Sequence, residues 1–368
     1  MNGNEKLQQL QTKRTIRIFL TAGIFLALTV LLYAAAAIFP RFADDVFHPV
    51  SRVLIYGLSW VTGWIPISVA EILLYIAVLG GVIALVRLIW VLVSGPRRVA
   101  FLLRFLAWVL LIAAVLVWMF CTFWGLNYQT SSIADELGLT LRRHSSEELA
   151  TLNRYLTERA NDLAAQVPRD AQGNVIAAPF ADMAERVAIE LGKVSGRKEA
   201  PAKPILASEP MSYTQITGIF VVFTAESNVN TNNVGYDLPF VIAHESAHRY
   251  GVAPENEANF FAFYLLEDAE DADLAYSVTM AALRYCQNAL YAVDYDEFAE
   301  IYGTYHPLVA ADMAAYSAHW KQYEGKVAEV SEAVNNTYLV VQGQSDGVRS
   351  YGRVVDLMLA WYDAEIGR

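Results

Sequence analysis

Two long stretches near the start of the chain contain apolar residues and no charge. Ile18–Phe39 has 22 consecutive uncharged residues, and Phe105–Trp124 has 20. A helix of about 20 residues spans the roughly 30 Å hydrocarbon core of a bilayer. Between them, Ile67–Val93 is interrupted only by Glu71 and Arg87, which can lie near the two membrane interfaces. We therefore predict three transmembrane helices, at about residues 18–39, 67–93 and 105–124.

Charge is distributed unevenly between the two parts of the chain. Residues 1–124 carry ten Lys or Arg and four Asp or Glu, whereas residues 125–368 carry 17 and 34. The basic residues cluster before the first apolar stretch and between the second and third, which places these segments in the cytoplasm. We expect a multi-pass protein of the cell membrane with a cytoplasmic N-terminus and an extracytoplasmic domain formed by residues 125–368. In the alternative, residues 67–93 form a surface or re-entrant helix.

The acidic part of the chain has the length and patterning of a folded domain. Its 3.6-residue periodicity predicts helices at about 145–167, 180–196, 239–251, 255–267, 271–293, 295–303, 307–333 and 347–365. The β-branched and aromatic run at Thr217–Phe223 predicts a strand, and the asparagine-rich residues 225–237 predict turns. The expected fold class is mainly α, with three N-terminal transmembrane helices and a small β-sheet in a mostly helical domain.

Composition excludes several functional classes. The chain has no basic face or basic aromatic cluster of the kind that binds nucleic acid. The two cysteines, Cys121 and Cys286, form neither a disulfide framework nor a CxxC metal site. The lipid bilayer is the expected partner of residues 1–124, and the oligomeric state is left open.

The sequence His244-Glu245-Ser246-Ala247-His248 is an HExxH motif. On a helix, residues i and i+4 share a face, so both imidazoles can bind one ion. A catalytic Zn²⁺ usually has three protein ligands and a water molecule. Glu245 is then placed to act as a general base toward that water.

A second helix is expected to supply the third ligand. Glu255-Asn256-Glu257-Ala258-Asn259 follows the reversal at Gly251 and Pro254. Glu255 and Asn259 lie at i and i+4, so the carboxylate can bind zinc while Asn259 bonds the second nitrogen of a histidine. Glu257 remains an alternative metal ligand.

This arrangement resembles the gluzincin metallopeptidases, which pair HExxH with a later ExxA[D/N] helix. The resemblance implies that His244, His248 and Glu255 are zinc ligands and that Glu245 is the general base. It also implies that the strand at Thr217–Phe223 binds extended substrate. Asn259 falls where many relatives have aspartate. The chain departs from the pattern in the interval between His248 and Glu255, which is shorter than in most gluzincins, and in having Glu257 available as a second candidate for the third ligand.

A wider resemblance covers nearly the whole chain. Its segments are GIFVVFTAESNVN, HESAHRYGVAPENEANFFAF, DADLAYS and GVRSYGRVVDLML. Together with the three N-terminal apolar stretches, they are similar to an uncharacterised bacterial family of membrane-anchored HExxH proteins. That resemblance implies the architecture and the zinc chemistry.

The expected function is that of a membrane-anchored zinc metallopeptidase. It hydrolyses a peptide or protein substrate outside the cytoplasmic membrane, through a zinc-bound water and Glu245. Tyr351 is a candidate donor to the oxyanion, as are Tyr276 and Tyr338. Glu226, Asn228 and Asn230 either line the cleft or make Asx turns. The alternatives are a non-proteolytic zinc-binding sensor or assembly factor in the membrane and a zinc amidase acting on the cell wall.

Overall fold

The computed structural model describes residues 3–39, 41–95, 97–341 and 351–367. They form two compact units. The first comprises residues 1–54 and 69–129, and the second comprises residues 55–68 and 130–368. The boundary near residue 54 falls inside helix α2 (His48–Thr62).

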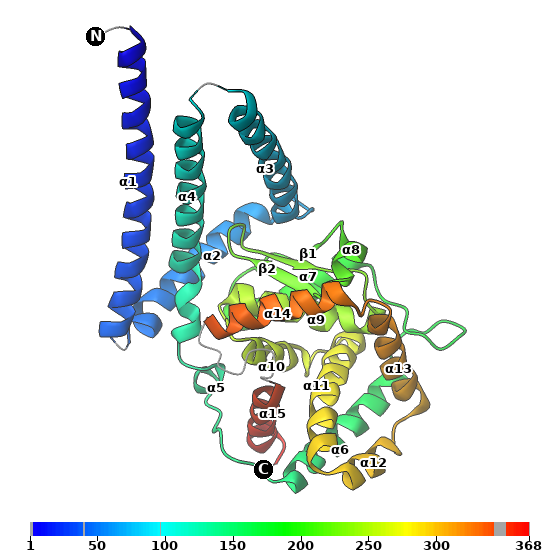
Figure 1. Ribbon diagram of the computed structural model, residues 1–368. Helices are drawn as coiled ribbons and strands as arrows, with labels where there is room; N and C mark the ends of the chain where they lie inside the picture. Colours follow the sequence, from blue (N-terminus) through cyan, green and yellow to red (C-terminus); the bar gives the residue numbers. More distant parts are fainter. Residues whose placement is uncertain (1–2, 40, 96, 342–350, 368) are drawn as a thin grey trace. The chain divides into compact units, whose positions relative to one another are not determined.

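The first unit consists of three long apolar helices and two short helical turns (Figure 1). Its elements are α1 (Gly3–Ile38), η1 (Ala43–Phe47), α3 (Val69–Ser94), α4 (Arg98–Phe123) and η2 (Gly125–Gln129). Each of the three long helices contains a segment long and apolar enough to cross a membrane. These segments correspond to the three predicted stretches, and they support association of the chain with a membrane.

Helix α4 packs against both α1 and α3. Small residues make the approach of α1 and α4 close, since Ala22, Ala107 and Ala114 are almost fully buried. Close packing through small side chains is the usual way in which helices associate in a membrane. Phe25 and Trp118 also meet across this interface, with ring centroids 5.1 Å apart.

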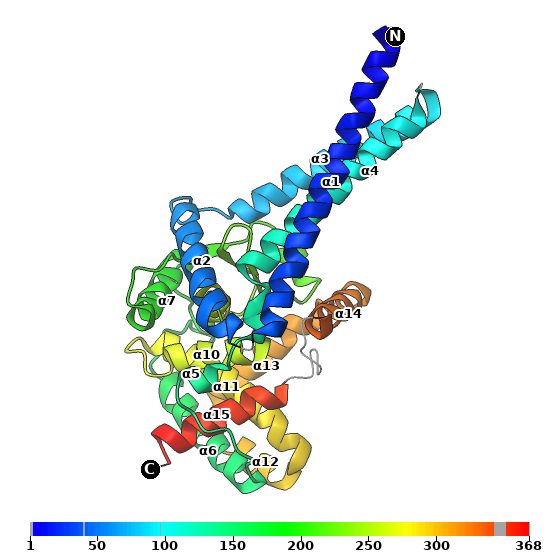
Figure 2. The same cartoon turned by 90° about the vertical axis from the view of Figure 1, so that its left-hand side faces the viewer.

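The second unit is mostly helical, as expected for the acidic part of the chain (Figure 2). Its helices are α5 (Ile133–Glu136), α6 (Ser146–Ala164), α7 (Phe180–Ser195), α8 (Ser208–Ser212), η3 (Gly235–Asp237), α9 (Leu238–Tyr250), α10 (Glu255–Leu266), α11 (Ala272–Val293), α12 (Tyr295–Tyr302), α13 (Pro307–Lys321), α14 (Lys326–Val341) and α15 (Tyr351–Glu365). Helices α9, α10 and α11 pack against one another. Their buried faces supply much of the hydrophobic core, which includes Phe260, Phe263 and Trp361.

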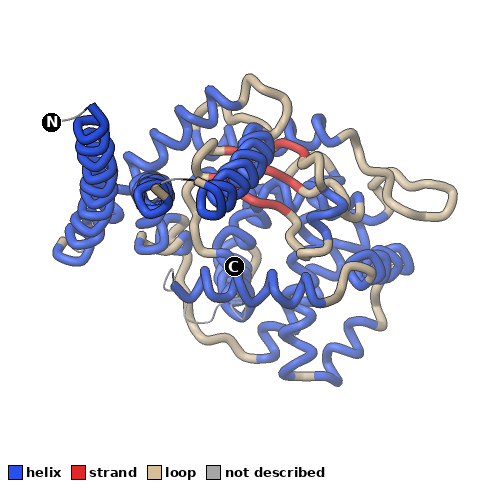
Figure 3. The backbone as a smooth tube through the Cα atoms, turned by 45° about the horizontal axis from the view of Figure 1, so that its top comes forward, coloured by secondary structure: helices blue, strands red, loops and turns tan. Residues whose placement is uncertain are grey.

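The small sheet of the described residues has three strands in the order β1-β3-β2. Its strands are red in Figure 3. They are β1 (Lys203–Pro204), β2 (Gly218–Val221) and β3 (Glu226–Val229). The central strand β3 pairs in parallel with β1 and antiparallel with β2, where Phe220 lies opposite Ser227. Strand β2 therefore forms one edge of the sheet, and it lies within the predicted strand at 217–223.

The prediction of turns at residues 225–237 was wrong for 226–229. These residues form the fully buried strand β3 although their side chains are polar. Each of the three residues makes a specific bond: Glu226 binds Lys203, Ser227 donates to the carbonyl of Glu245, and Asn228 donates to the carbonyl of Glu226. Among the described residues, only the Oδ1 atom of Asn228 is left without a partner in this strand. Burial of a polar strand is tolerated when its groups are bonded in this way.

The predicted helix at 307–333 is also corrected. It is divided into α13 and α14 by residues 322–325, and Gly325 has a φ of 154°. Glycine adopts this backbone conformation without the steric cost that a Cβ atom imposes. The division gives α14 a direction of its own.

Candidate metal centre

Helix α9 carries the HExxH motif and is defined at both ends. Pro239 lies in its first turn, where a missing N–H group costs nothing. Gly251 ends the helix with a φ of 121°, and its N–H donates to the carbonyls of Ala247 and His248. The chain then reverses and begins α10 at Glu255. This reversal brings the first turn of α10 against the histidine face of α9.

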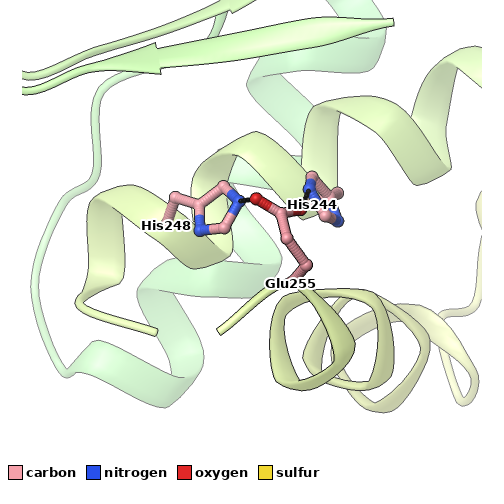
Figure 4. A group of neighbouring side chains, drawn as sticks. All are labelled: His244, His248 and Glu255. Carbon is pink, nitrogen blue, oxygen red and sulfur yellow. Dashed lines mark ion pairs between the residues drawn. The ribbon is translucent and has the colours of Figure 1, made fainter. Parts of the chain in front are cut away.

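Three side chains converge between these helices (Figure 4). The Nε2 atom of His244 lies 3.3 Å from Oε2 of Glu255, and Nε2 of His248 lies 3.5 Å from Oε1. The three candidate ligand atoms all lie within 4.8 Å of one another. Glu255 thus joins the histidines, whereas Glu257 accepts a hydrogen bond from the backbone N–H of Ile133 at 2.8 Å.

The donor set fits a zinc ion. Zn²⁺ binds imidazole nitrogen and carboxylate oxygen at about 2.0–2.2 Å, usually in a tetrahedron. In such a tetrahedron, neighbouring ligand atoms are about 3.3–3.6 Å apart. The distances from Glu255 to the two imidazoles, 3.3 and 3.5 Å, are of that order, with each imidazole facing a different oxygen of the carboxylate. Two histidines and one glutamate also leave a fourth position open, as a catalytic site requires.

A backbone carbonyl orients His248. Its Nδ1 atom lies 2.8 Å from the carbonyl oxygen of Val252, which can only accept a hydrogen bond. Nδ1 therefore carries a proton, and the lone pair of the neutral ring is on Nε2, which faces Glu255. The Nδ1 atom of His244 is buried and has no partner in the described part of the chain. Asn259 therefore does not make the predicted hydrogen bond to the second nitrogen of a histidine. Its side chain lines a cavity beside the three candidate ligands.

Mutual electrostatics hold the cluster together. Burial disfavours charge on His248, but the Glu255 carboxylate outweighs it and raises the pKa of His248 to about 9. Burial likewise opposes ionisation of Glu255, yet the two imidazoles keep the pKa of Glu255 well below its ordinary value. The carboxylate is therefore ionised. A metal ion that binds here displaces protons from the imidazoles.

Glu245 is buried beside the cluster. Burial, the largest cause, raises its pKa to about 7, against the opposing effect of His244 and His248. Its Oε2 atom has no hydrogen-bond partner among the described residues. The hydroxyl of Ser227 donates to the Glu245 carbonyl at 2.8 Å, which ties this turn of α9 to β3.

Strand β2 passes closely over Glu245. A Cβ atom built on Gly218 would lie only 2.5 Å from Oε1 of Glu245. The backbone can approach the carboxylate because position 218 has no side chain. The backbone N–H of Phe220 also donates to the carboxyl group of Glu245.

A cavity of about 200 Å³ adjoins the cluster. His244 and Glu255 line it, and so do Thr217 and Asn259. It is also lined by Asp237 and Arg284, for which the sequence contains no recognisable motif. The two side chains form an ion pair, with Nη2 of Arg284 2.7 Å from Oδ1 of Asp237. Their proximity depends on the packing of α11 beside α9.

The tyrosines considered as oxyanion donors have other environments. Tyr276 is buried and donates to Asp312 at 2.5 Å, within a network that includes Arg169. Tyr351 begins α15, but its side chain lies outside the described part of the structure. Tyr338 lies on α14 and is partly exposed.

The three polar residues around β3 are structural in their contacts. Asn230 accepts a hydrogen bond from the backbone N–H of Asn232, as in an Asx turn. Glu226 pairs with Lys203, and Asn228 bonds the backbone of the sheet.

One known protein family matches most of the chain. The model of a family described as "Protein of unknown function (DUF3810)" matches residues 45–359. The chain belongs to the DUF3810 family. The match includes the HExxH helix, α10 and two of the three apolar helices, so an uncharacterised family is confirmed. No curated protein and no solved structure matches the chain.

Proposed function

We propose that this DUF3810 protein is a zinc-dependent peptidase that is anchored in a membrane. The observation that carries the proposal is the convergence of His244, His248 and Glu255 beside the buried carboxyl group of Glu245. Zinc would be held by these three ligands. When bound, the ion lowers the pKa of a water molecule and polarises a carbonyl group.

Glu245 performs the proton transfers. Burial raises its pKa above that of an exposed carboxyl group, which is the direction that suits a general base near neutral pH. It accepts a proton from the attacking water and later donates it to the leaving amine. Burial between α9 and β2 holds the carboxyl group in place for both transfers.

Strand β2 offers a place for the peptide. It is an edge strand, and it runs directly past Glu245. An extended peptide can add to such an edge through main-chain hydrogen bonds. This would bring a peptide carbonyl between Glu245 and the metal ligands.

The charge distribution supports a location for the reaction. The basic residues beside the apolar helices favour a cytoplasmic N-terminus and an extracytoplasmic catalytic domain. We therefore propose that the substrate is a peptide or protein on the outer side of the cytoplasmic membrane.

The test uses the full-length protein in detergent and the single substitution Glu245→Gln. We expect about one zinc ion per chain in both proteins by elemental analysis. Cells that carry the wild-type protein should contain extracytoplasmic cleavage products that are missing from cells with the variant. Absence of stoichiometric zinc, or identical cleavage products in both strains, contradicts the proposal. Zinc binding without any cleavage product favours the sensor or assembly role, and altered cell-wall fragments favour the amidase.

A further inference from the structure

The guanidinium of Arg284, beside the candidate metal centre, has one N–H group without a hydrogen-bond partner among the described residues. Its Nη2 atom binds Asp237, and its guanidinium lies 4.0 Å from the ring centroid of Tyr316. Its Nη1 atom is buried and has no hydrogen-bond partner within residues 3–341 and 351–367, apart from the gaps at 40 and 96. A buried donor of a charged group without an acceptor is costly, and such a group often awaits a ligand.

In contrast to Arg284, both side-chain oxygens of Asp237 accept hydrogen bonds. Its Oδ1 atom accepts from Arg284, and its Oδ2 atom accepts from the Asn233 amide at 2.8 Å. Each oxygen of this carboxylate therefore accepts a hydrogen bond, one from the guanidinium and one from the amide. Burial opposes the charge on Arg284, but Asp237 keeps its pKa above the ordinary value, so the residue is cationic.

The position of the ion pair relative to the metal ligands follows from α9. Asp237 immediately precedes the helix and lies seven residues before His244, on the same face. Two helical turns correspond to about 10 Å along the axis. A peptide in extended conformation advances about 3.3–3.6 Å per residue. Arg284 therefore lies too far away to bind the scissile carbonyl oxygen, but within reach of a group two or three residues beyond it.

Resting on the proposed peptidase function, we propose that Arg284 binds a carboxylate of the substrate two or three residues beyond the scissile bond. Arg284 lines the same cavity as the proposed ligands His244 and Glu255. At about 200 Å³, this cavity is smaller than most sites for drug-sized ligands. A cavity of this size suits a short terminal segment of a peptide. Among side chains, the guanidinium of arginine has the geometry best suited to bind a carboxylate. The substrate class is a peptide cleaved close to its C-terminus, or close to an acidic side chain.

The test measures binding, so it does not depend on turnover. Acetyl-trialanine, its C-terminal amide and the amide acetyl-Ala-Ala-Glu-NH₂ are titrated calorimetrically into full-length, zinc-loaded Glu245→Gln protein in detergent. We expect the free acid to bind at least about tenfold more tightly than the neutral amide. If the glutamyl amide binds like the neutral amide, the carboxylate is the chain terminus. If it binds like the free acid, a side-chain carboxylate is also accepted.

Arg284→Lys provides the test on the protein side, because it keeps the charge and removes the forked geometry. We expect it to reduce the preference for the free acid several-fold. Arg169→Lys is the matched control: Arg169 also pairs with a buried aspartate, Asp312, and lies 5.8 Å from the ring of Tyr276, but it does not line the cavity. This control should keep the preference.

Equal binding of acid and amide, or no binding of the free acid at all, overturns the carboxylate site. Failure of the protein to bind zinc overturns the proposed function instead. In that case the same titrations into metal-free protein still decide whether Arg284 binds a carboxylate.

Discussion

At the scale of single residues, the site depends on the absence of a side chain at position 218 as much as on the reacting groups. Gly218 lets the backbone of β2 lie against the Glu245 carboxyl group. Burial raises the pKa of Glu245 to about 7, while the N–H of Phe220 on the same strand acts in the opposite direction. A side chain at this position would displace the general base without touching a metal ligand.

Gly218→Ala should therefore lower peptide hydrolysis at least about tenfold, since small displacements of a catalytic group have effects of this order or more. Zinc content should stay at the wild-type level, because the change lies against Glu245 and not against the ligands. Gly352→Ala is the control, because a Cβ atom there meets nothing within 4 Å. Wild-type hydrolysis rates in Gly218→Ala would show that the close approach has no role.

Replacing each of the two glutamates at the start of α10 by glutamine tests which of them binds the metal. Glu255→Gln removes a carboxylate that lies 3.3 and 3.5 Å from the two imidazoles. Glu257→Gln changes a carboxylate bonded to the backbone of Ile133. Zinc affinity, measured by competition with a chelator, should fall at least about 100-fold in the first and little in the second, since even outer groups contribute 10–100-fold. The reverse order would assign the ligand to Glu257.

At the scale of elements, the α9–α10 pair acts as one unit. Four residues separate the helices, and the reversal needs a backbone conformation that Gly251 supplies. The metal ligands sit on both sides of this reversal, so its geometry determines whether the carboxylate meets the imidazoles. Strand β3 supports the other face of α9 through Ser227.

Gly251→Ala should destabilise the protein by about 1–3 kcal/mol, the cost of a strained backbone at a φ of 121°. We expect a lower thermal unfolding midpoint for the full-length protein in detergent, together with weaker zinc binding. Gly352→Ala, which adds the same methyl group within α15, serves again as the control. A wild-type midpoint in Gly251→Ala would mean that the reversal accepts a side chain.

The C-terminal end of α10 predicts a pH dependence. Burial, assisted by Asp268, raises the pKa of Glu267 to about 7, although Arg159 acts in the opposite direction. The folded protein then binds a proton that the unfolded chain, with a pKa of about 4.3, releases. This contribution to stability is complete below about pH 4 and is lost as pH rises toward 7.

In Glu267→Gln the side chain at position 267 cannot ionise, so this pH dependence of stability should disappear. Relative to the variant, the wild-type protein should lose roughly 1–3 kcal/mol of stability between pH 5 and pH 8. The measurement is the thermal unfolding midpoint of both full-length proteins across this range. Parallel pH profiles would show that the carboxyl group is not held neutral.

At the scale of the whole molecule, three apolar helices and a mostly helical second unit are joined in one chain. The chain is acidic where it is predicted to lie outside and basic at the predicted cytoplasmic segments. This charge distribution makes a prediction about topology that needs no enzyme assay.

Single cysteines introduced at Glu300 and at Ser94 should react differently with a membrane-impermeant thiol reagent in intact cells. Both positions are exposed, and the native Cys121 and Cys286 are buried, which keeps background labelling low. We expect labelling of Glu300→Cys and none of Ser94→Cys until the cells are permeabilised. Labelling of Ser94→Cys alone would reverse the topology.

Much of this architecture is encoded locally and could be derived from the sequence. Apolar runs long enough to span a bilayer, helical periodicity and the HExxH spacing depend on neighbouring residues only. For that reason the three apolar helices, the main helices of the second unit and the shared face of His244 and His248 were predictable. The presence of a carboxylate shortly after Gly251 was predictable in the same way.

Other features were decided by contacts between distant segments. Strand β3 looked like a polar loop, because its partners Lys203 and Glu245 lie elsewhere in the chain. The sequence favoured Glu255 as the third ligand and left Glu257 as the alternative. The packing of α10 places Glu255 against the histidines and Glu257 against the backbone of Ile133. Arg284 entered the site only because α11 packs beside α9 and places it against Asp237. The sequence by itself determined the chemical groups that are available, and the tertiary structure decided which of them face the same cavity, because proximity across the fold follows from packing and not from spacing along the chain.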